Sequence, residues 1–106
     1  MRCLVTGASG HLGSYLTRRL LEAGHTVTVV VRPQSDLWRL ADVIADTTVI
    51  RSQLEDIDQV ESALMAAAPE VVFHFAWQGV TSKFRNDLHQ IENNLLGSVR
   101  LLEIVQ

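Results

Sequence analysis

The chain has 106 residues, 47% of them apolar, which is the length of one domain with enough apolar side chains for a core. Its formal net charge of -3 excludes a basic surface of the kind that binds nucleic acid or an anionic membrane. Cys3 is the only cysteine, which excludes an intrachain disulfide framework and a clustered thiolate metal site, and its place in an apolar run predicts a small buried residue.

Strands and helices are predicted to alternate along the chain. The predicted strands are Arg2–Thr6, Thr26–Val31, Thr47–Arg51 and Val71–Phe75. The predicted helices are His11–Ala23, a short one over Ser35–Ile44, one that begins at Asp56 or Asp58 and ends before Pro69, and a last one from near Asn86. This alternation predicts an α/β fold with parallel strands and helices on both faces of the sheet.

Apolar stripes predict how the helices face. In the first helix Leu12, Leu16 and Leu20 share one face, with Arg18 and Arg19 outward. The second helix is predicted to turn Leu37, Leu40 and Ile44 inward. The last helix carries a stripe of Leu88, Ile91, Leu95, Val99 and Leu102.

Residues 4–13, LVTGASGHLG, are the most informative stretch, because an apolar strand runs into a three-glycine turn and then a helix. Gly7 permits a sharp turn, Gly10 leaves room for a bound group beside the backbone, and Gly13 lets the helix lie close to the sheet. The N–H groups of the helix's first turn then suit a pyrophosphate. This context favours a dinucleotide site over the alternative, a purely structural turn.

These residues resemble a known family. Thr6-Gly7-x-x-Gly10-x-x-Gly13 resembles the cofactor loop of the short-chain dehydrogenase/reductase superfamily, and most closely its extended branch of nucleotide-sugar epimerases, dehydratases and reductases. Three further segments resemble that branch: Pro69–Ala76, with its His-x-Ala turn under the cofactor, Gln53-Leu54, beside the adenine, and residues 93–98, NNLLGS, similar to the family's Asn-x-x-Gly-Thr segment.

The resemblance implies a Rossmann-like, doubly wound parallel sheet with strand order 3-2-1-4, incomplete without a C-terminal half. Residues 1–106 are then expected to be the dinucleotide-binding domain, at the N-terminal part of a longer enzyme. The residues expected to contact the cofactor are Thr6, Gly7, Ser9, Gly10, His11, Leu12, Gly13, Arg32, Gln53, Leu54, Phe75, Ala76, Trp77, Asn93 and Asn94.

The resemblance also implies the reaction, a hydride transfer on a nucleotide-linked sugar by an epimerase, dehydratase or ketoreductase. The family's catalytic pair is a Tyr followed four residues later by a Lys, with the Tyr as general acid or base. Tyr15 and Lys83, the only residues of their types, are too far apart to form this pair, so no catalytic residue is expected and the chain alone is expected to be inactive. The alternative function is a non-catalytic module that binds or senses a dinucleotide.

Cofactor choice depends on the end of the second strand, where an acidic residue suits NAD and an arginine suits the 2′-phosphate of NADP. The family's acidic position falls on Val31, Arg32 follows, and no carboxylate comes before Asp36. NADP is therefore favoured and NAD remains possible, with a solvated Arg32 at a strand end as the alternative.

Other candidates favour a structural interpretation. His74, in an apolar strand, is predicted to be a hydrogen-bonded core residue rather than a catalytic one. Trp77 either lines the nicotinamide or substrate side of the cofactor site or packs under the next loop. The basic loop around Lys83 and Arg85 is expected to be solvated. No metal site is expected.

The longest apolar run, 27–31, is too short to span a bilayer, and no signal peptide precedes the first strand, so a cytoplasmic protein is expected.

The implied strand order leaves Val71–Phe75 at an edge of the sheet, with no charge or proline to discourage pairing. The stripe on the last helix adds apolar surface. We therefore expect a homo-oligomer.

Overall fold

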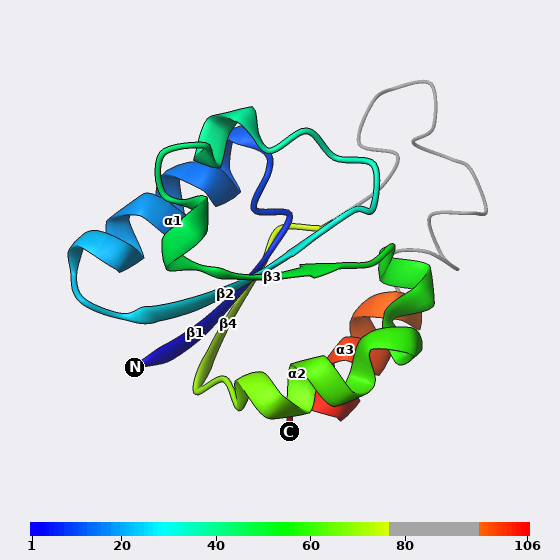
Figure 1. The fold of residues 1–106 in the computed structure, drawn as a ribbon. Helices are drawn as coiled ribbons and strands as arrows, with labels where there is room; N and C mark the ends of the chain where they lie inside the picture. Colours follow the sequence, from blue (N-terminus) through cyan, green and yellow to red (C-terminus); the bar gives the residue numbers. More distant parts are fainter. Residues whose placement is uncertain (77–95) are drawn as a thin grey trace.

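The structure, a computed structural model, describes residues 1–76 and 96–106. Four parallel strands form one sheet in the order β3-β2-β1-β4 (Figure 1). They are β1 (Arg2–Thr6), β2 (Thr26–Val31), β3 (Thr48–Arg51) and β4 (Val71–His74). The predicted fold class and strand order are confirmed.

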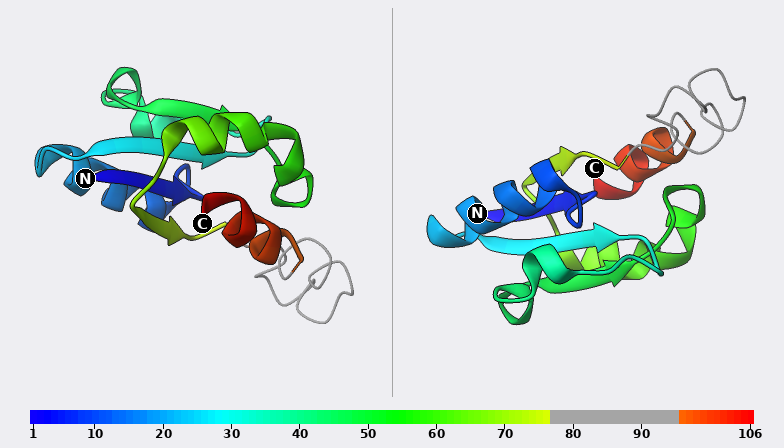
Figure 2. Two further views of the ribbon diagram at one scale, coloured as in Figure 1. Left: turned by 90° about the horizontal axis from the view of Figure 1, so that it is seen from below. Right: turned by 90° about the horizontal axis from the view of Figure 1, so that it is seen from above.

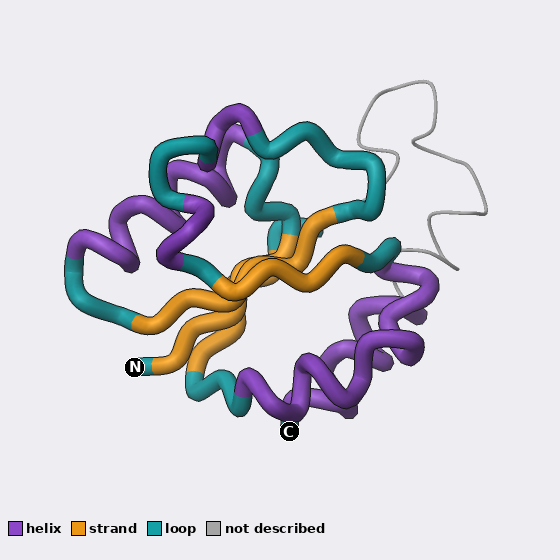
Figure 3. The backbone as a smooth tube through the Cα atoms, in the orientation of Figure 1, coloured by secondary structure: helices purple, strands orange, loops and turns teal. Residues whose placement is uncertain are grey.

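Helices cover both faces of the sheet. The α-helices are α1 (His11–Glu22), α2 (Glu61–Ala67) and α3 (Gly97–Val105), and the 3-10 helices are η1 (Trp38–Leu40), η2 (Ile44–Asp46) and η3 (Leu54–Val60). The segments α1, η1 and η2 lie on one face and η3, α2 and α3 on the other (Figure 2). Figure 3 shows the same layers, with the strands in orange between two groups of helices. Within the described residues, no helix is long and apolar enough to cross a membrane.

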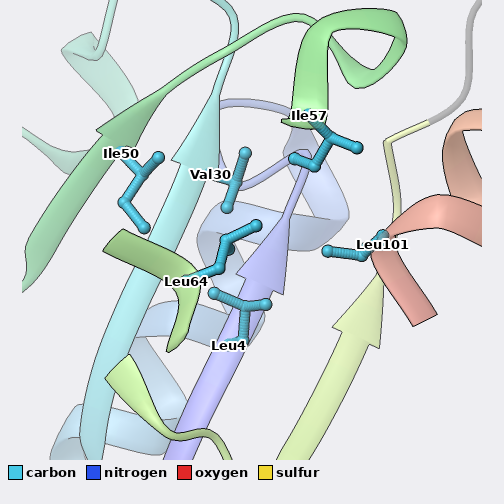
Figure 4. Close-up of a cluster of buried hydrophobic side chains, with 6 residues drawn as sticks. All are labelled: Leu4, Val30, Ile50, Ile57, Leu64 and Leu101. Atoms are coloured by element: carbon cyan, nitrogen blue, oxygen red, sulfur yellow. The ribbon is translucent and has the colours of Figure 1, made fainter. Parts of the chain in front are cut away.

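The two faces of the sheet carry separate apolar clusters. One consists of Leu4, Val30, Ile50, Ile57, Leu64 and Leu101, contributed by three strands and by η3, α2 and α3 (Figure 4). The other consists of Val5, Ala8, Val27, Val29, Val31 and Leu40. Because side chains of a strand alternate between faces and both faces of the sheet are covered, the consecutive β2 residues Val27–Val31, Thr28 included, are all buried. Cys3 is buried and unbonded, as predicted.

The face of α1 that meets the sheet differs from the predicted leucine stripe. Gly13, Ser14 and Thr17 are buried, whereas Leu12 is 63% exposed. The helix approaches the rest of the chain so closely at Gly13 that only small side chains fit beneath it. Steric fit at Gly13 therefore sets how α1 lies on the sheet: Leu20 packs against the core, as the leucine spacing predicts, whereas Leu12 does not.

Arg18 of α1 is only partly outward, contrary to the prediction. Its guanidinium binds both carboxylate oxygens of Asp42, at 2.5 and 2.6 Å, and also donates to the carbonyl oxygen of Arg39. The hydrogen bonds from Arg18 lower the pKa of the Asp42 carboxyl below its usual value. The segment after β2 is thereby tied to α1.

The predicted helix over Ser35–Ile44 is wrong, because two separate 3-10 turns, η1 and η2, take its place. The Asp36 carboxylate accepts the backbone N–H of Trp38 at 3.1 Å, a local turn that competes with helix formation. Leu40 still fills the core, since a short turn is enough to bury one side chain.

The helix expected from Asp56 or Asp58 begins later, at Glu61. The preceding residues form η3, in which Asp56 has non-helical φ and ψ of -106° and 18°. Leu54 and Ile57, on either side of this kink, are both buried, so the segment reaches the core without forming a regular helix.

Candidate dinucleotide-binding site

The predicted site residues gather at the carboxyl edge of the sheet. Because the strands are parallel, the segments that follow them emerge together: Gly7 after β1, Arg32 after β2, Gln53 beyond β3 and Phe75 after β4. The chain adds β2 and β3 on one side of β1 and then crosses back to add β4 on the other side, so the strand order reverses between β1 and β4. Ligands of open α/β sheets bind at such a switch point. Trp77, Asn93 and Asn94 lie outside the described residues.

Gly7 makes the sharp turn that the sequence predicts. Its φ is +68°, in the left-handed region that favours glycine. A Cβ added there would lie 2.8 Å from the carbonyl carbon of Phe75 and 2.9 Å from the nitrogen of Ala76. The glycine loop therefore rests directly on the turn that ends β4.

Gly10 is different, because the fold itself does not require a glycine there. Its φ and ψ of -81° and 178° are ordinary extended values. The nearest atom to an added Cβ is the carbonyl oxygen of Gly7, at a normal contact distance of 3.5 Å. Space therefore remains beside the Gly10 backbone, as the prediction of a bound group there requires.

Gly13 confirms the close helix approach. A Cβ on it would lie 2.3 Å from the carbonyl oxygen of Gly7 and 2.9 Å from the Cα of Ala8. Within the described part of the chain, no side chain caps the N-terminus of α1. The N–H groups of its first turn, together with the helix dipole, are thus suited to an anion.

Arg39 is a residue of the site that the sequence analysis missed. Its guanidinium donates to the carbonyl oxygen of Ser9 at 3.0 Å and contacts His11 Nε2 at 3.1 Å. It also stacks over the ring of Trp38, 4.4 Å from the centroid. A cation therefore lies against the glycine loop. The one signal for it was an arginine in the segment that follows the second strand.

Arg32 is exposed immediately after β2, at the predicted position. Arg51 holds the backbone around it, donating to the carbonyl oxygens of Arg32, Pro33 and Ser35 at 3.4, 3.0 and 3.2 Å. Within residues 1–76 and 96–106 no carboxylate forms a salt bridge with Arg32. Its charge is therefore available at this edge of the sheet.

Gln53 and Leu54, predicted to lie beside the adenine, follow β3. Leu54 is 6% exposed and lies against Gly97 of α3, where an added Cβ would come within 2.6 Å of Leu54 Cγ. The glycine of the NNLLGS segment thus lets α3 cross closely over the start of η3.

His74 is hydrogen-bonded, as predicted, but it is half-buried rather than part of the core. Its Nδ1 lies 2.6 Å from Thr6 Oγ1, and its Nε2 lies 2.7 Å from Ser98 Oγ. Thr6 Oγ1 also accepts the backbone N–H groups of Phe75 at 3.0 Å and Ala76 at 3.1 Å. Burial lowers the pKa of His74, so the neutral imidazole is favoured.

Tyr15 lies on α1 and is 61% exposed, and Lys83 lies outside the described residues. The geometry around the glycine loop can hold an anionic group. Of the two histidines there, His74 is engaged on both ring nitrogens, and His11 Nε2 lies against the Arg39 guanidinium.

Similarity to known proteins adds to this structural evidence. The sequence profile of the NAD dependent epimerase/dehydratase family matches residues 3–106. The chain is 46% identical over 78 residues to an uncharacterized protein of Mycobacterium bovis, covering 73% of this chain and 8% of that protein. It is 32% identical to a probable UDP-glucuronate 4-epimerase of Rhizobium meliloti, covering 100% of this chain and 34% of that protein.

Among solved structures, the chain is similar to the UDP-glucose 4-epimerase of Thermus thermophilus in complex with NAD. The TM-score is 0.82 and the identity 33%, over 98% of this chain and 33% of that one. The chain therefore spans about a third or less of the length of these relatives.

Proposed function

Because the chain belongs to the NAD dependent epimerase/dehydratase family, we propose that residues 1–106 form a dinucleotide-binding domain whose Gly7–Gly13 loop receives the pyrophosphate of NAD or NADP. One observation carries the proposal: Gly7 and Gly13 are required by the fold, whereas Gly10 is not. A glycine without a structural reason, beside an uncapped helix N-terminus, is accounted for by a ligand that approaches the backbone.

The remaining predicted contacts complete this proposed site. Thr6 directly precedes the loop, Ser9, His11 and Leu12 lie within it, Gln53 and Leu54 lie toward the adenine, and Phe75 and Ala76 lie under the loop. Trp77, Asn93 and Asn94 stay predictions. Arg39 is added because it contacts Ser9 and His11.

The preference for NADP is also a proposal, and it rests on Arg32 alone. A guanidinium at the end of β2 suits a 2′-phosphate, and Arg32 has no carboxylate partner among the described residues. The similar Thermus thermophilus structure contains NAD, which is why both cofactors must be compared.

For the whole protein, we propose hydride transfer on a nucleotide-linked sugar, as in an epimerase, dehydratase or ketoreductase. The support is the similarity to UDP-sugar epimerases. Within this chain Tyr15 is on α1 and no Tyr-x-x-x-Lys pair occurs, so the segment would supply cofactor binding and would be inactive alone.

Isothermal titration calorimetry of the chain with NAD and with NADP tests the binding proposal. We expect saturable binding of at least one of them, with competition by ADP-ribose, which shares the pyrophosphate. No saturable heat from either cofactor would reject the proposal. Conversion of a UDP-sugar by the chain on its own would contradict the assignment of catalysis to residues outside it.

A further inference from the structure

The hydroxyl of Thr6 lies at the centre of a hydrogen-bond network. The number of donors and acceptors around its oxygen fixes the direction of each hydrogen bond. Thr6 is fully buried, and its Oγ1 is within hydrogen-bond distance of three nitrogens. Two of them, the backbone nitrogens of Phe75 and Ala76, can only donate; the Phe75 N–H is shared with the Thr6 carbonyl oxygen at 3.2 Å. A hydroxyl oxygen accepts two hydrogen bonds and donates one.

With both lone pairs of Thr6 Oγ1 occupied, its hydrogen is left for the third neighbour, His74 Nδ1, at 2.6 Å. Nδ1 must then accept and carry no proton. In a neutral imidazole the proton is consequently on Nε2, which faces Ser98 Oγ at 2.7 Å and donates to it.

We propose that His74 is a positioning residue, held as the neutral Nε2–H tautomer, which orients the Thr6 hydroxyl so that it holds the Phe75–Ala76 turn beneath the glycine loop. The consequence for cofactor binding rests on the proposed function of that loop; the tautomer and the hold on the turn do not. The network joins β1, β4 and α3 through one imidazole ring.

The turn matters because the glycine loop rests on it. An added Cβ on Gly7 would lie within 2.9 Å of Phe75 and Ala76 backbone atoms, so the two segments are in direct contact. If the Thr6 hydroxyl rotates, the Ala76 N–H loses the one acceptor that it has among residues 1–76 and 96–106. The turn would then relax, and Gly7 would move with it.

Nitrogen-15 NMR of the His74 ring, in the chain without ligand, tests the tautomer directly. We expect a pyridine-like shift for Nδ1 and a pyrrole-like shift for Nε2 at neutral pH. The reverse assignment, or the averaged shifts of a rapidly exchanging or protonated ring, would overturn the proposal. Simple burial of a histidine predicts no particular tautomer, so the result separates positioning from packing.

A matched pair of substitutions tests the hold on the turn. His74→Asn can place an amide oxygen near the position of Nδ1, so it keeps the acceptor for Thr6 and loses the bond to Ser98. His74→Gln reaches the position of Nε2, so it keeps the bond to Ser98 and loses the acceptor. The variants Thr6→Ser and Thr6→Val form a second pair, with and without the hydroxyl.

We expect the Ala76 amide to exchange its hydrogen about tenfold faster in His74→Gln and Thr6→Val, and at a rate close to the wild-type one in His74→Asn and Thr6→Ser. The dissociation constant for the dinucleotide should rise by about five- to tenfold in the first two variants only. Equal exchange rates in His74→Gln and His74→Asn would overturn the proposal. A wild-type chain that binds no dinucleotide would reject the proposed function, while the NMR and exchange results would still decide the role of His74.

Discussion

The carbonyl oxygen of Gly7 lies 2.3 Å from the position that a Cβ on Gly13 would occupy. A Cβ on Gly10, in the same loop, would come no closer than 3.5 Å to that oxygen. The three glycines, identical in spacing, therefore have different physical roles. Gly13 keeps the loop and α1 together, and Gly10 keeps a space open.

A substitution at Gly10 is expected to affect dinucleotide binding, and a substitution at Gly13 is expected to affect the stability of the fold. Gly10→Val should leave the fold intact, because the backbone there is extended and an added Cβ comes no closer than 3.5 Å to a protein atom. It should abolish measurable dinucleotide binding, because the side chain fills the approach to the backbone. Gly13→Ala should lower the free energy of unfolding by about 1–3 kcal/mol through overpacking.

Denaturant unfolding and calorimetry on the same samples check both effects, with Gly10→Ala as the intermediate case. An unchanged dinucleotide affinity in a folded Gly10→Val chain would remove the assignment of this loop to the pyrophosphate. A Gly13→Ala chain as stable as the wild type would show that the contact with Gly7 relaxes at no cost.

Arg32→Ala is expected to discriminate between the two cofactors. If the guanidinium binds a 2′-phosphate, the variant should lose about 1.5–3 kcal/mol of NADP affinity and almost none of the NAD affinity. Arg19→Ala, which removes the same charge from an exposed position on α1, is the matched control. Equal losses for both cofactors, or a wild-type preference for NAD, would contradict the NADP proposal.

Arg39→Ala should instead weaken both cofactors alike, because Arg39 holds the loop at Ser9 and His11. Loss of the hydrogen bond to the Ser9 carbonyl oxygen is worth about 0.5–1.5 kcal/mol. Titrations with NAD and NADP should therefore show the same few-fold rise in dissociation constant. A loss confined to NADP would move the 2′-phosphate contact from Arg32 to Arg39.

His74 should make the chain less stable as the pH falls below the ordinary imidazole value of about 6.5. Its pKa is lowered in the folded state by burial, so in this range the unfolded chain binds more protons than the folded one. The free energy of unfolding therefore rises with pH there and levels off above it.

Denaturant unfolding at about pH 7.5 and about pH 5.5 measures this slope. The difference between the two pH values should shrink in His74→Asn, which keeps the Thr6 contact and removes the titrating ring. The other three histidines, His11, His25 and His89, are present in both proteins and cancel in the comparison. An identical pH dependence in the variant would show that the pKa of His74 is not lowered by folding.

The sequence predicted the strands and the glycine loop well because their determinants are local. The β-branched run of Thr26–Val31 is typical of a strand covered on both faces, and the φ of Gly7 follows from the turn that it must make. Strand order followed from the family resemblance rather than from the residues of β3 or β4.

The failed and missing predictions depend on a local turn at Asp36 and on contacts between segments distant in sequence, and apolar spacing reports neither. The apolar positions Leu37, Leu40 and Ile44 fit a helix, but two 3-10 turns place them against the core equally well. Likewise, nothing local to Arg39 indicates that it reaches the carbonyl oxygen of Ser9, 30 residues earlier in the chain. Such a contact exists only once α1 and η1 have come together on the sheet.

Self-association is the last expectation. Within the described residues β4 is an edge strand, since it pairs with β1 only. No charged residue or proline interrupts its sequence, VVFH, so the free edge is not protected against pairing. Leu96, directly before α3, and Val99 and Leu102, on α3, are 58%, 47% and 58% exposed and form apolar surface of the kind that favours association.

We expect a two-fold dimer or a larger assembly that uses one of these two surfaces. Light scattering over a range of concentrations measures the mass, and Val99→Lys with Leu102→Lys shows which surface is used. If the double variant is monomeric, α3 forms the interface; if it still associates, the interface is the edge of β4. Met65→Lys, which replaces a 61% exposed side chain on α2, controls for added charge. A wild-type chain that remains monomeric at high micromolar concentration would contradict the prediction, because neither surface would then drive association.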